Sequence, residues 1–184
     1  MHAIDVIIPV VWIAFWVYWF VAAVRTKTTR SRNASSLPIR VAILILILLS
    51  LRVGVFKGHS GATIHNPWLL GFGLAVFLAG LALAVWARVY LGRNWGTPMS
   101  LKVDPELITT GPYRYVRHPI YSGIILGMIG TTMAVSLYWL LAVGLLGAYF
   151  IYSATVEERN MERLFPESYP AYKSSTKMLV PFVF

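Results

Sequence analysis

Residues 111–123, GPYRYVRHPIYSG, bring several reactive side chains to the start of a long hydrophobic run. A glycine-proline pair indicates a turn. Arg117 and His118 then come directly before Pro119, which suits the first turn of a helix. A helix N-terminus has free amide donors and a partial positive charge, so the segment predicts a site for an anionic group. The structural alternative is that Arg117 anchors to phospholipid headgroups and His118 caps the helix.

A second polar segment, EERNMERLFPESYPAY at residues 157–172, follows the next hydrophobic stretch. Glu157 and Glu158 are adjacent carboxylates that could bind the hydroxyls or the amino group of a ligand. Glu158 and Glu162 are four residues apart, and basic residues alternate with them, which is typical of a charged, solvated helix. Composition alone leaves both interpretations open.

The composition indicates that a membrane positions these two segments. Hydrophobic residues make up 58% of the 184 residues and charged residues only 12%, whereas a typical globular chain is about a quarter charged. A soluble domain of this size could not bury so much apolar surface. We therefore expect an all-α fold, a polytopic integral membrane helix bundle that forms a single membrane domain over residues 1–184.

Five apolar stretches are long enough to cross about 30 Å of hydrocarbon. They cover residues 6–24, about 37–56, 67–87 and, as a pair, 119–156. The pair carries no charge and predicts a C-terminal helical hairpin that breaks near residues 130–136. Residues 1–90 would then hold three transmembrane helices, and residues 91–184 the hairpin with a polar loop and tail.

The glycines of the third stretch, Gly71, Gly73 and Gly80, lie in an apolar helix rather than in a nucleotide-binding glycine fingerprint. Small residues in such a helix favour close helix packing.

The basic residues predict the orientation of these helices. The net charge is +9, and a five-span arrangement puts 14 of the 16 basic residues on one side, with only Arg52 and Lys57 opposite. The positive-inside rule then places the N-terminus outside the cytosol, and both candidate segments and the C-terminus inside it. Basic residues between apolar runs indicate anionic membrane lipids as partners rather than nucleic acid.

Several other classes of site are excluded by residue type. The chain has no cysteine, so disulfides and thiolate chemistry are absent. Its four histidines, His2, His59, His65 and His118, show no metal-ligand spacing. We expect no metal site, and the oligomeric state stays open.

The order of the two polar segments resembles the isoprenylcysteine carboxyl methyltransferase family and its relatives among the phospholipid methyltransferases. That family has an RHPxYxG segment, a helical hairpin, a glutamate pair and a tyrosine-rich tail. Residues 117–123, RHPIYSG, match the first part, and the second part is matched by Glu157, Glu158, Phe165, Tyr169 and Tyr172. The likeness covers about the C-terminal half, from Leu91 onward.

The resemblance implies an S-adenosylmethionine-dependent enzyme that methylates a lipid-like acceptor at the cytosolic face, with carboxyl O-methylation as the first expectation. The residues that it implies for cofactor binding are Glu106, Leu107, Ile108, Tyr113, His118, Pro119, Ile120, Tyr121 and Glu157. The candidate catalytic residues are Arg117, Arg114 and Glu158.

The acceptor class decides what these candidates would do. A carboxylate is already ionised near pH 7, and Arg114 or Arg117 could orient it. An amine would need deprotonation, for which Glu157 or Glu158 could act as base. A phospholipid or amine N-methyltransferase is therefore the nearest alternative, and a sterol-reductase-like membrane enzyme is a weaker one. A non-enzymatic carrier is the alternative outside enzymes, but no span carries an acidic residue at mid-membrane.

Overall fold

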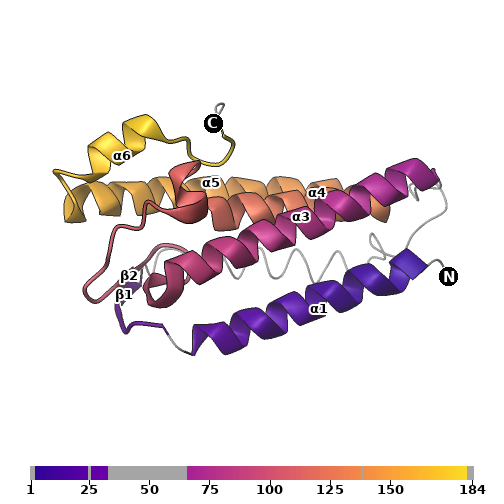
Figure 1. The fold of residues 1–184 in the computed structure, drawn as a ribbon, viewed down its shortest axis with the longest axis horizontal. Coiled ribbons are helices and arrows are strands. Elements are labelled where there is room, and N and C mark those ends of the chain that lie inside the picture. The colour runs from indigo at the N-terminus through magenta and orange to yellow at the C-terminus, as the bar shows by residue number, and fades with distance from the viewer. Residues whose placement is uncertain (1–2, 25, 33–65, 138, 182–184) are drawn as a thin grey trace.

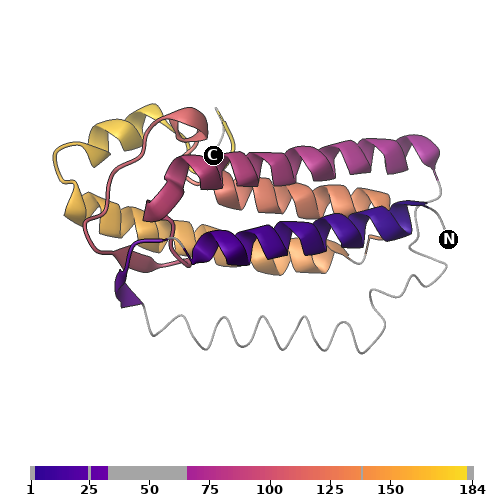
Figure 2. The same cartoon turned by 60° about the horizontal axis from the view of Figure 1, so that its bottom comes forward.

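A computed structural model describes residues 3–24, 26–32, 66–137 and 139–181. Four long helices lie side by side along the long axis of the molecule (Figure 1). They are α1 (Ala3–Ala23), α3 (Pro67–Leu91), α4 (Pro119–Ala134) and α5 (Trp139–Leu164). The shorter elements gather at the end where α1, α3 and α5 finish and α4 begins (Figure 2). They are β1 (Thr29–Arg32), η2 (Gly92–Asn94), β2 (Ser100–Lys102), η3 (Gly111–Arg114) and α6 (Tyr169–Ser175).

The expectation of an all-α membrane fold is confirmed. Within the described part of the chain, three helices are long and apolar enough to cross a membrane. Their candidate spans are residues 6–23, 67–94 and 139–164. Helix α4 is apolar but has only 16 residues, fewer than the roughly 20 that span a bilayer without tilt or thinning. The second predicted span, about residues 37–56, lies outside the described residues.

The predicted C-terminal hairpin is present, and it turns after Ala134, inside the predicted interval. Helix α5 continues to Leu164, well past the end of the apolar stretch. Glu157 and Glu158 therefore lie within a helical turn rather than after the helix. Because neighbouring residues of a helix point in different directions, the two carboxylates face different partners.

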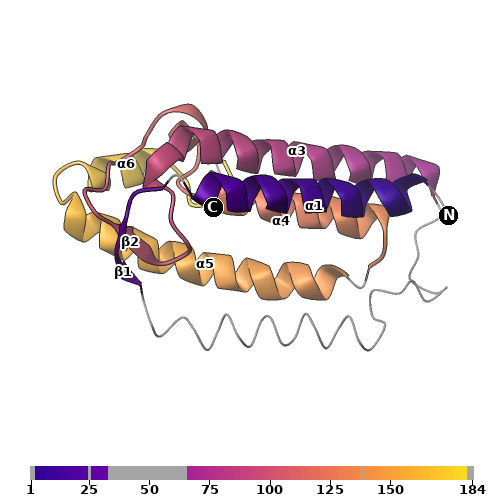
Figure 3. The same cartoon turned by 90° about the horizontal axis from the view of Figure 1, so that it is seen from below.

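Two short strands form a feature that the sequence does not signal. Strand β1 pairs with β2 in an antiparallel ribbon, with Thr29 opposite Lys102 and Arg32 opposite Ser100. Residues of the basic loop after α1 thus pair with the polar loop after α3 (Figure 3). The ribbon places the end of α1 beside the loop that carries Glu106.

Glycines hold α3 and α4 close together, and among the described elements this helix pair packs most extensively. A Cβ atom at Gly73 would lie 2.8 Å from the backbone nitrogen of Ala134, and one at Gly80 would lie 2.6 Å from the carbonyl oxygen of Gly123. By contrast, a Cβ atom at Gly71 would meet nothing within 4 Å. Gly73 and Gly80 therefore serve the close packing expected of small residues, and Gly71 does not.

Candidate active site

A cavity of about 400 Å³ opens at the end of the bundle where the short elements gather. Its size falls within the roughly 300–1,000 Å³ typical of small-molecule pockets. Eight of the nine residues expected to bind a cofactor line it: Glu106, Leu107, Ile108, Tyr113, His118, Ile120, Tyr121 and Glu157. The ninth, Pro119, is fully buried at the first position of α4 and does not line the cavity.

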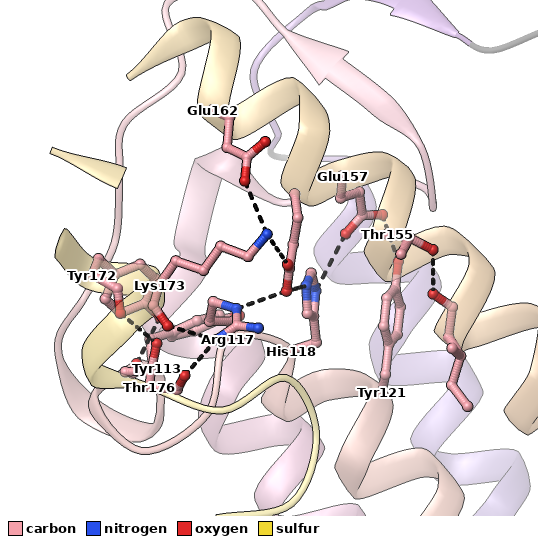
Figure 4. Close-up of polar contacts among 12 residues, drawn as sticks. Tyr113, Arg117, His118, Tyr121, Thr155, Glu157, Glu162, Tyr172, Lys173 and Thr176 are labelled. Atoms are coloured by element: carbon pink, nitrogen blue, oxygen red, sulfur yellow. Dashed lines mark hydrogen bonds and ion pairs between the residues drawn. The ribbon is translucent and has the colours of Figure 1, made fainter. Parts of the chain in front are cut away.

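Glu157 presents a partly exposed carboxylate to this cavity, with 26% of its side chain accessible. Its Oε1 atom accepts hydrogen bonds from the Tyr121 hydroxyl at 2.6 Å and from the Met99 amide at 2.9 Å. Its Oε2 atom lies 3.5 Å from Nδ1 of His118. One carboxylate oxygen is thus held by two hydrogen bonds, while the other faces the His118 ring (Figure 4).

Glu158 has other main partners than Glu157 and is buried, with 3% of its side chain exposed. It accepts a hydrogen bond from Nε of Arg117 at 2.6 Å, and Nζ of Lys173 lies 3.1 Å from its other oxygen. Nη1 of Arg117 donates to the carbonyl oxygens of Lys173 and Thr176. Arg117 lines the cavity, and its contacts tie it to α5 through Glu158 and to α6 and the following residue through the two carbonyl groups (Figure 4).

His118 lies between the two glutamates. Its Nδ1 atom is near Glu157, and its Nε2 atom is 3.4 Å from Oε1 of Glu158 but has no hydrogen-bond partner among the described residues. Burial acts to lower the pKa of His118, but the interactions with Glu157 and Glu158 outweigh it and raise the pKa above its ordinary value. His118 therefore keeps its proton to a higher pH than a free histidine does, and it lies at the cavity wall.

Aromatic rings form another part of the wall. The rings of His118, Tyr121 and Phe150 stack in a column, with centroid separations of 5.5 and 4.6 Å. On the other side, the Tyr172 hydroxyl donates to the carbonyl oxygen of Tyr113 at 2.7 Å. Burial raises the pKa of Tyr172 to about 12, so it keeps this donor proton at neutral pH.

Glu106 lies at the exposed rim. Lys27 Nζ donates to Oε1 of Glu106 at 2.7 Å and to the carbonyl oxygen of Asp104, also at 2.7 Å. Asn94 donates to Oε2 of Glu106 at 3.3 Å. These hydrogen bonds lower the pKa of Glu106, and the one from Lys27 has the largest effect. The rim therefore carries a carboxylate at all physiological pH values.

The C-terminal segment after α6 is hydrogen-bonded to the start of α4. The Arg117 amide donates to the carbonyl oxygen of Lys177 at 2.8 Å, and the His118 amide donates to that of Met178 at 3.1 Å. The Ser122 hydroxyl donates to the carbonyl oxygen of Leu179 at 2.6 Å. The amides of the two residues before α4 thus bind the chain's own C-terminal segment.

The three candidate catalytic residues are not brought together. Arg117 and Glu158 form one buried pair, but Arg114 is exposed, does not line the cavity and stacks over the ring of Tyr115 at 5.1 Å. Sequence reasoning also missed cavity residues from other elements, namely Trp16, Trp19, Phe20, Trp95 and Met161. The first three lie in a helix with no motif, so only their unusual aromatic density could have marked them.

The model of the family described as phospholipid methyltransferase matches residues 68–168 of this chain. Protein-S-isoprenylcysteine O-methyltransferase B of Arabidopsis thaliana is 26% identical over 63% of this chain and 61% of its own length. A nickel-cobalt-cadmium resistance protein of Alcaligenes xylosoxydans xylosoxydans is 30% identical over 62% of this chain and 52% of its own. Methanethiol S-methyltransferase of Pseudomonas sp. (strain GM41(2012)) is 26% identical over 64% of this chain and 48% of its own.

The chain thus spans roughly half the length of these curated relatives. The matched residues 68–168 run from the start of α3 to just before α6. They include both segments that the cavity brings together, the RHPIYSG residues and the glutamate pair. On this match the chain belongs to the phospholipid methyltransferase family.

Proposed function

We propose that this protein is an integral membrane methyltransferase that uses S-adenosylmethionine and acts on a lipid-like acceptor. The observation that carries the proposal is the joining of Glu157, His118 and Tyr121 at one cavity, at the end of helices that are long and apolar enough to cross a membrane. Relatives in this family are named as methyltransferases with different acceptors.

The chemistry of the wall suits this cofactor. A sulfonium compound that also carries an ammonium group is attracted to carboxylates and to the faces of aromatic rings. The wall offers the partly exposed carboxylate of Glu157 and the rings of Tyr113 and Tyr121. When bound, S-adenosylmethionine supplies an electrophilic methyl group.

The protein's own contribution would be to bind, to orient and to exclude water. Holding two reactants in line and close together can lower a barrier by about 7–11 kcal/mol. Glu157 is pre-oriented by Tyr121 and by the Met99 amide, so it needs no rearrangement to bind a cation. Glu106, Leu107 and Ile108 would hold the ligand from the rim, and the C-terminal segment would keep water from the wall formed by Arg117 and His118.

Carboxyl O-methylation is the first candidate reaction. A carboxylate acceptor is ionised at neutral pH, so it requires no base from the protein. Nε and Nη1 of Arg117 are bound to Glu158 and to backbone carbonyl groups, so these two atoms would hold the side chain rather than orient the acceptor. Arg114 would have no role in the cavity, since it lies outside.

Amine N-methylation is the second candidate, and the contact between Glu157 and His118 favours it. Nδ1 of His118 lies 3.5 Å from Oε2 of Glu157, so the two side chains could take up and share the proton that an amine must lose. Amine N-methylation would use the same cofactor-binding wall as carboxyl O-methylation. It would differ only in the proton transfer from the amine.

We further propose that the active site and the C-terminus face the cytosol and that the acceptor comes from the membrane. The polar end of the bundle carries the basic residues of the loop after α3 and of the tail, including Arg93, Lys102, Arg159 and Lys173. The positive-inside rule favours the cytosolic side for such an end.

The discriminating experiment is product analysis with S-adenosylmethionine labelled on its methyl group. Purified protein is incubated with membrane lipid extracts, and the labelled lipids are treated with alkali. A carboxyl methyl ester releases labelled methanol, whereas a methylated amine keeps its label. Absence of labelled lipid with every acceptor class tested would contradict the proposed activity.

A further inference from the structure

One wall of the cavity lies outside the segment that defines the family. Helix α1 precedes the matched residues, and it contributes Trp16, Trp19 and Phe20 to the cavity lining. All three are aromatic. Trp16 and Phe20 are also exposed on the outside of the molecule, at 42% and 70%. Among the described residues, helix α1 therefore lies between this part of the cavity and the outer surface of the bundle.

Trp19 is the buried member of this wall, with 6% exposed. Its ring meets the ring of Trp95 edge-on, with the centroids 5.7 Å apart. Trp95 also lines the cavity and comes from the loop that follows η2. The two indole rings form a continuous apolar surface, which we call the Trp19–Trp95 wall.

A buried arginine holds this wall in place. Arg88, 4% exposed, donates from Nη2 to the carbonyl oxygen of Ala22 at 2.8 Å and from Nη1 to that of Gly92 at 2.7 Å. Its Cζ atom lies 4.7 Å from the centroid of the Trp95 ring. A single guanidinium group thus links the end of α1, the end of α3 and the indole of Trp95.

The other walls of the cavity are chemically different. The carboxylate of Glu157 and the imidazole of His118 come from α5 and from the residue before α4. The two indole rings carry no carboxylate, and burying a hydrocarbon chain against them is favourable. The cavity therefore offers a charged side to a cofactor and an apolar side to a second molecule.

We propose that the Trp19–Trp95 wall, positioned by Arg88, binds the apolar chain of the acceptor and selects acceptors by that chain. The inference rests on the proposed function, because it assigns the acceptor side of the same cavity. It makes Trp19 and Trp95 specificity-determining residues and makes Arg88 a positioning residue.

The test uses the full chain in detergent and a stearic acid that carries a photoreactive diazirine on its hydrocarbon chain. Labelled positions are mapped by mass spectrometry, with unlabelled stearate as competitor. The variants are Trp19→Leu, Trp95→Leu, the milder Trp95→Phe and, for the positioning residue, Arg88→Gln. Trp68→Leu is the control, since Trp68 is 86% exposed and does not line the cavity. Binding of S-adenosylmethionine is measured by calorimetry on the same samples.

We expect labelling at residues 19 and 95 that saturates with competitor. The leucine variants should need about tenfold more stearate for the same competition, and Trp95→Phe and Arg88→Gln about threefold more. Cofactor affinity should stay within about twofold, and Trp68→Leu should behave like the wild type.

Labelling that does not saturate, or variants that weaken cofactor binding as much as stearate binding, would overturn the assignment. Saturable labelling in a protein that does not bind S-adenosylmethionine would instead support hydrocarbon binding at the Trp19–Trp95 wall but contradict the proposed function.

Discussion

The Nε atom of Arg117 lies 2.6 Å from Oε1 of Glu158, and both side chains are buried. The two residues are 41 positions apart, on either side of the helical hairpin. Their ion pair joins the residue before α4 to the last turns of α5, where the cavity walls meet. Because a buried charge without its partner is costly, this pair fixes the relative position of the two segments.

Arg117→Ala should therefore destabilise the protein by about 3–5 kcal/mol, the usual cost of breaking a buried ion pair. Lys173, 3.1 Å from the other oxygen of Glu158, should keep the loss toward the lower value. Thermal unfolding in detergent measures the change. Arg114→Ala is the matched control, because Arg114 is exposed. Equal melting temperatures for the two variants would show that the buried pair does not hold the site together.

Stability should fall as pH rises above the ordinary pKa of histidine. The pKa of His118 is raised in the folded protein, so its stabilising contribution is complete below the ordinary histidine pKa of about 6.5. The contribution is lost as pH rises through the folded-state pKa. Melting temperatures from pH 6 to pH 9 should fall more steeply for the wild type than for His118→Asn. Parallel pH profiles for the two proteins would contradict the charged contacts with Glu157 and Glu158.

The close packing of α3 against α4 predicts that the same substitution at two glycines of α3 will change stability differently. Gly80→Ala would push a methyl group against the backbone of α4 at Gly123, whereas Gly71→Ala meets nothing within 4 Å. We expect Gly80→Ala to cost about 1–3 kcal/mol through overpacking. Gly71→Ala should be neutral or slightly stabilising. If both variants unfold at the wild-type temperature, the close approach of α3 and α4 is wrong.

Glu106→Gln should separate ligand binding from stability. The side chain is exposed and pairs with Lys27 at the rim, and exposed ion pairs add little to folding. The melting temperature should stay at the wild-type value. Affinity for S-adenosylmethionine should fall about threefold, and less at high salt, because screening already weakens a surface charge. Unchanged affinity at low salt would remove Glu106 from the proposed ligand contacts.

Much of the fold could be predicted because hydropathy in a membrane protein reports directly on helix position. The uncharged stretch 119–156 indicated the hairpin, and the structure turns it after Ala134. The β1–β2 ribbon could not be predicted, since its strands lie about 70 residues apart and neither has an alternating pattern. The different surroundings of Glu157 and Glu158 depend on the continuation of α5, which charge composition does not reveal.

The candidate site was predictable where a motif marked it and not elsewhere. The motif residues His118, Tyr121 and Glu157 do meet at one cavity. Arg114, three residues before Arg117, lies outside because the short helix η3 turns its side chain to solvent. Trp19 reaches the cavity only through tertiary packing of α1, which carries no motif. Local sequence thus identified the charged wall but not the apolar one.

Calorimetric binding of S-adenosylmethionine to the purified protein tests the central claim most directly. Wild type, Glu157→Gln, Glu157→Ala and Glu162→Ala are compared. The glutamine can still accept from Tyr121 and Met99 but lacks the charge, and Glu162 pairs with Lys173 away from the cavity.

The account predicts micromolar binding by the wild type and by Glu162→Ala, about tenfold weaker binding by Glu157→Gln, and still weaker binding by Glu157→Ala. A folded wild-type protein that does not bind S-adenosylmethionine, or that binds it equally well in all four forms, would contradict the proposed cofactor site.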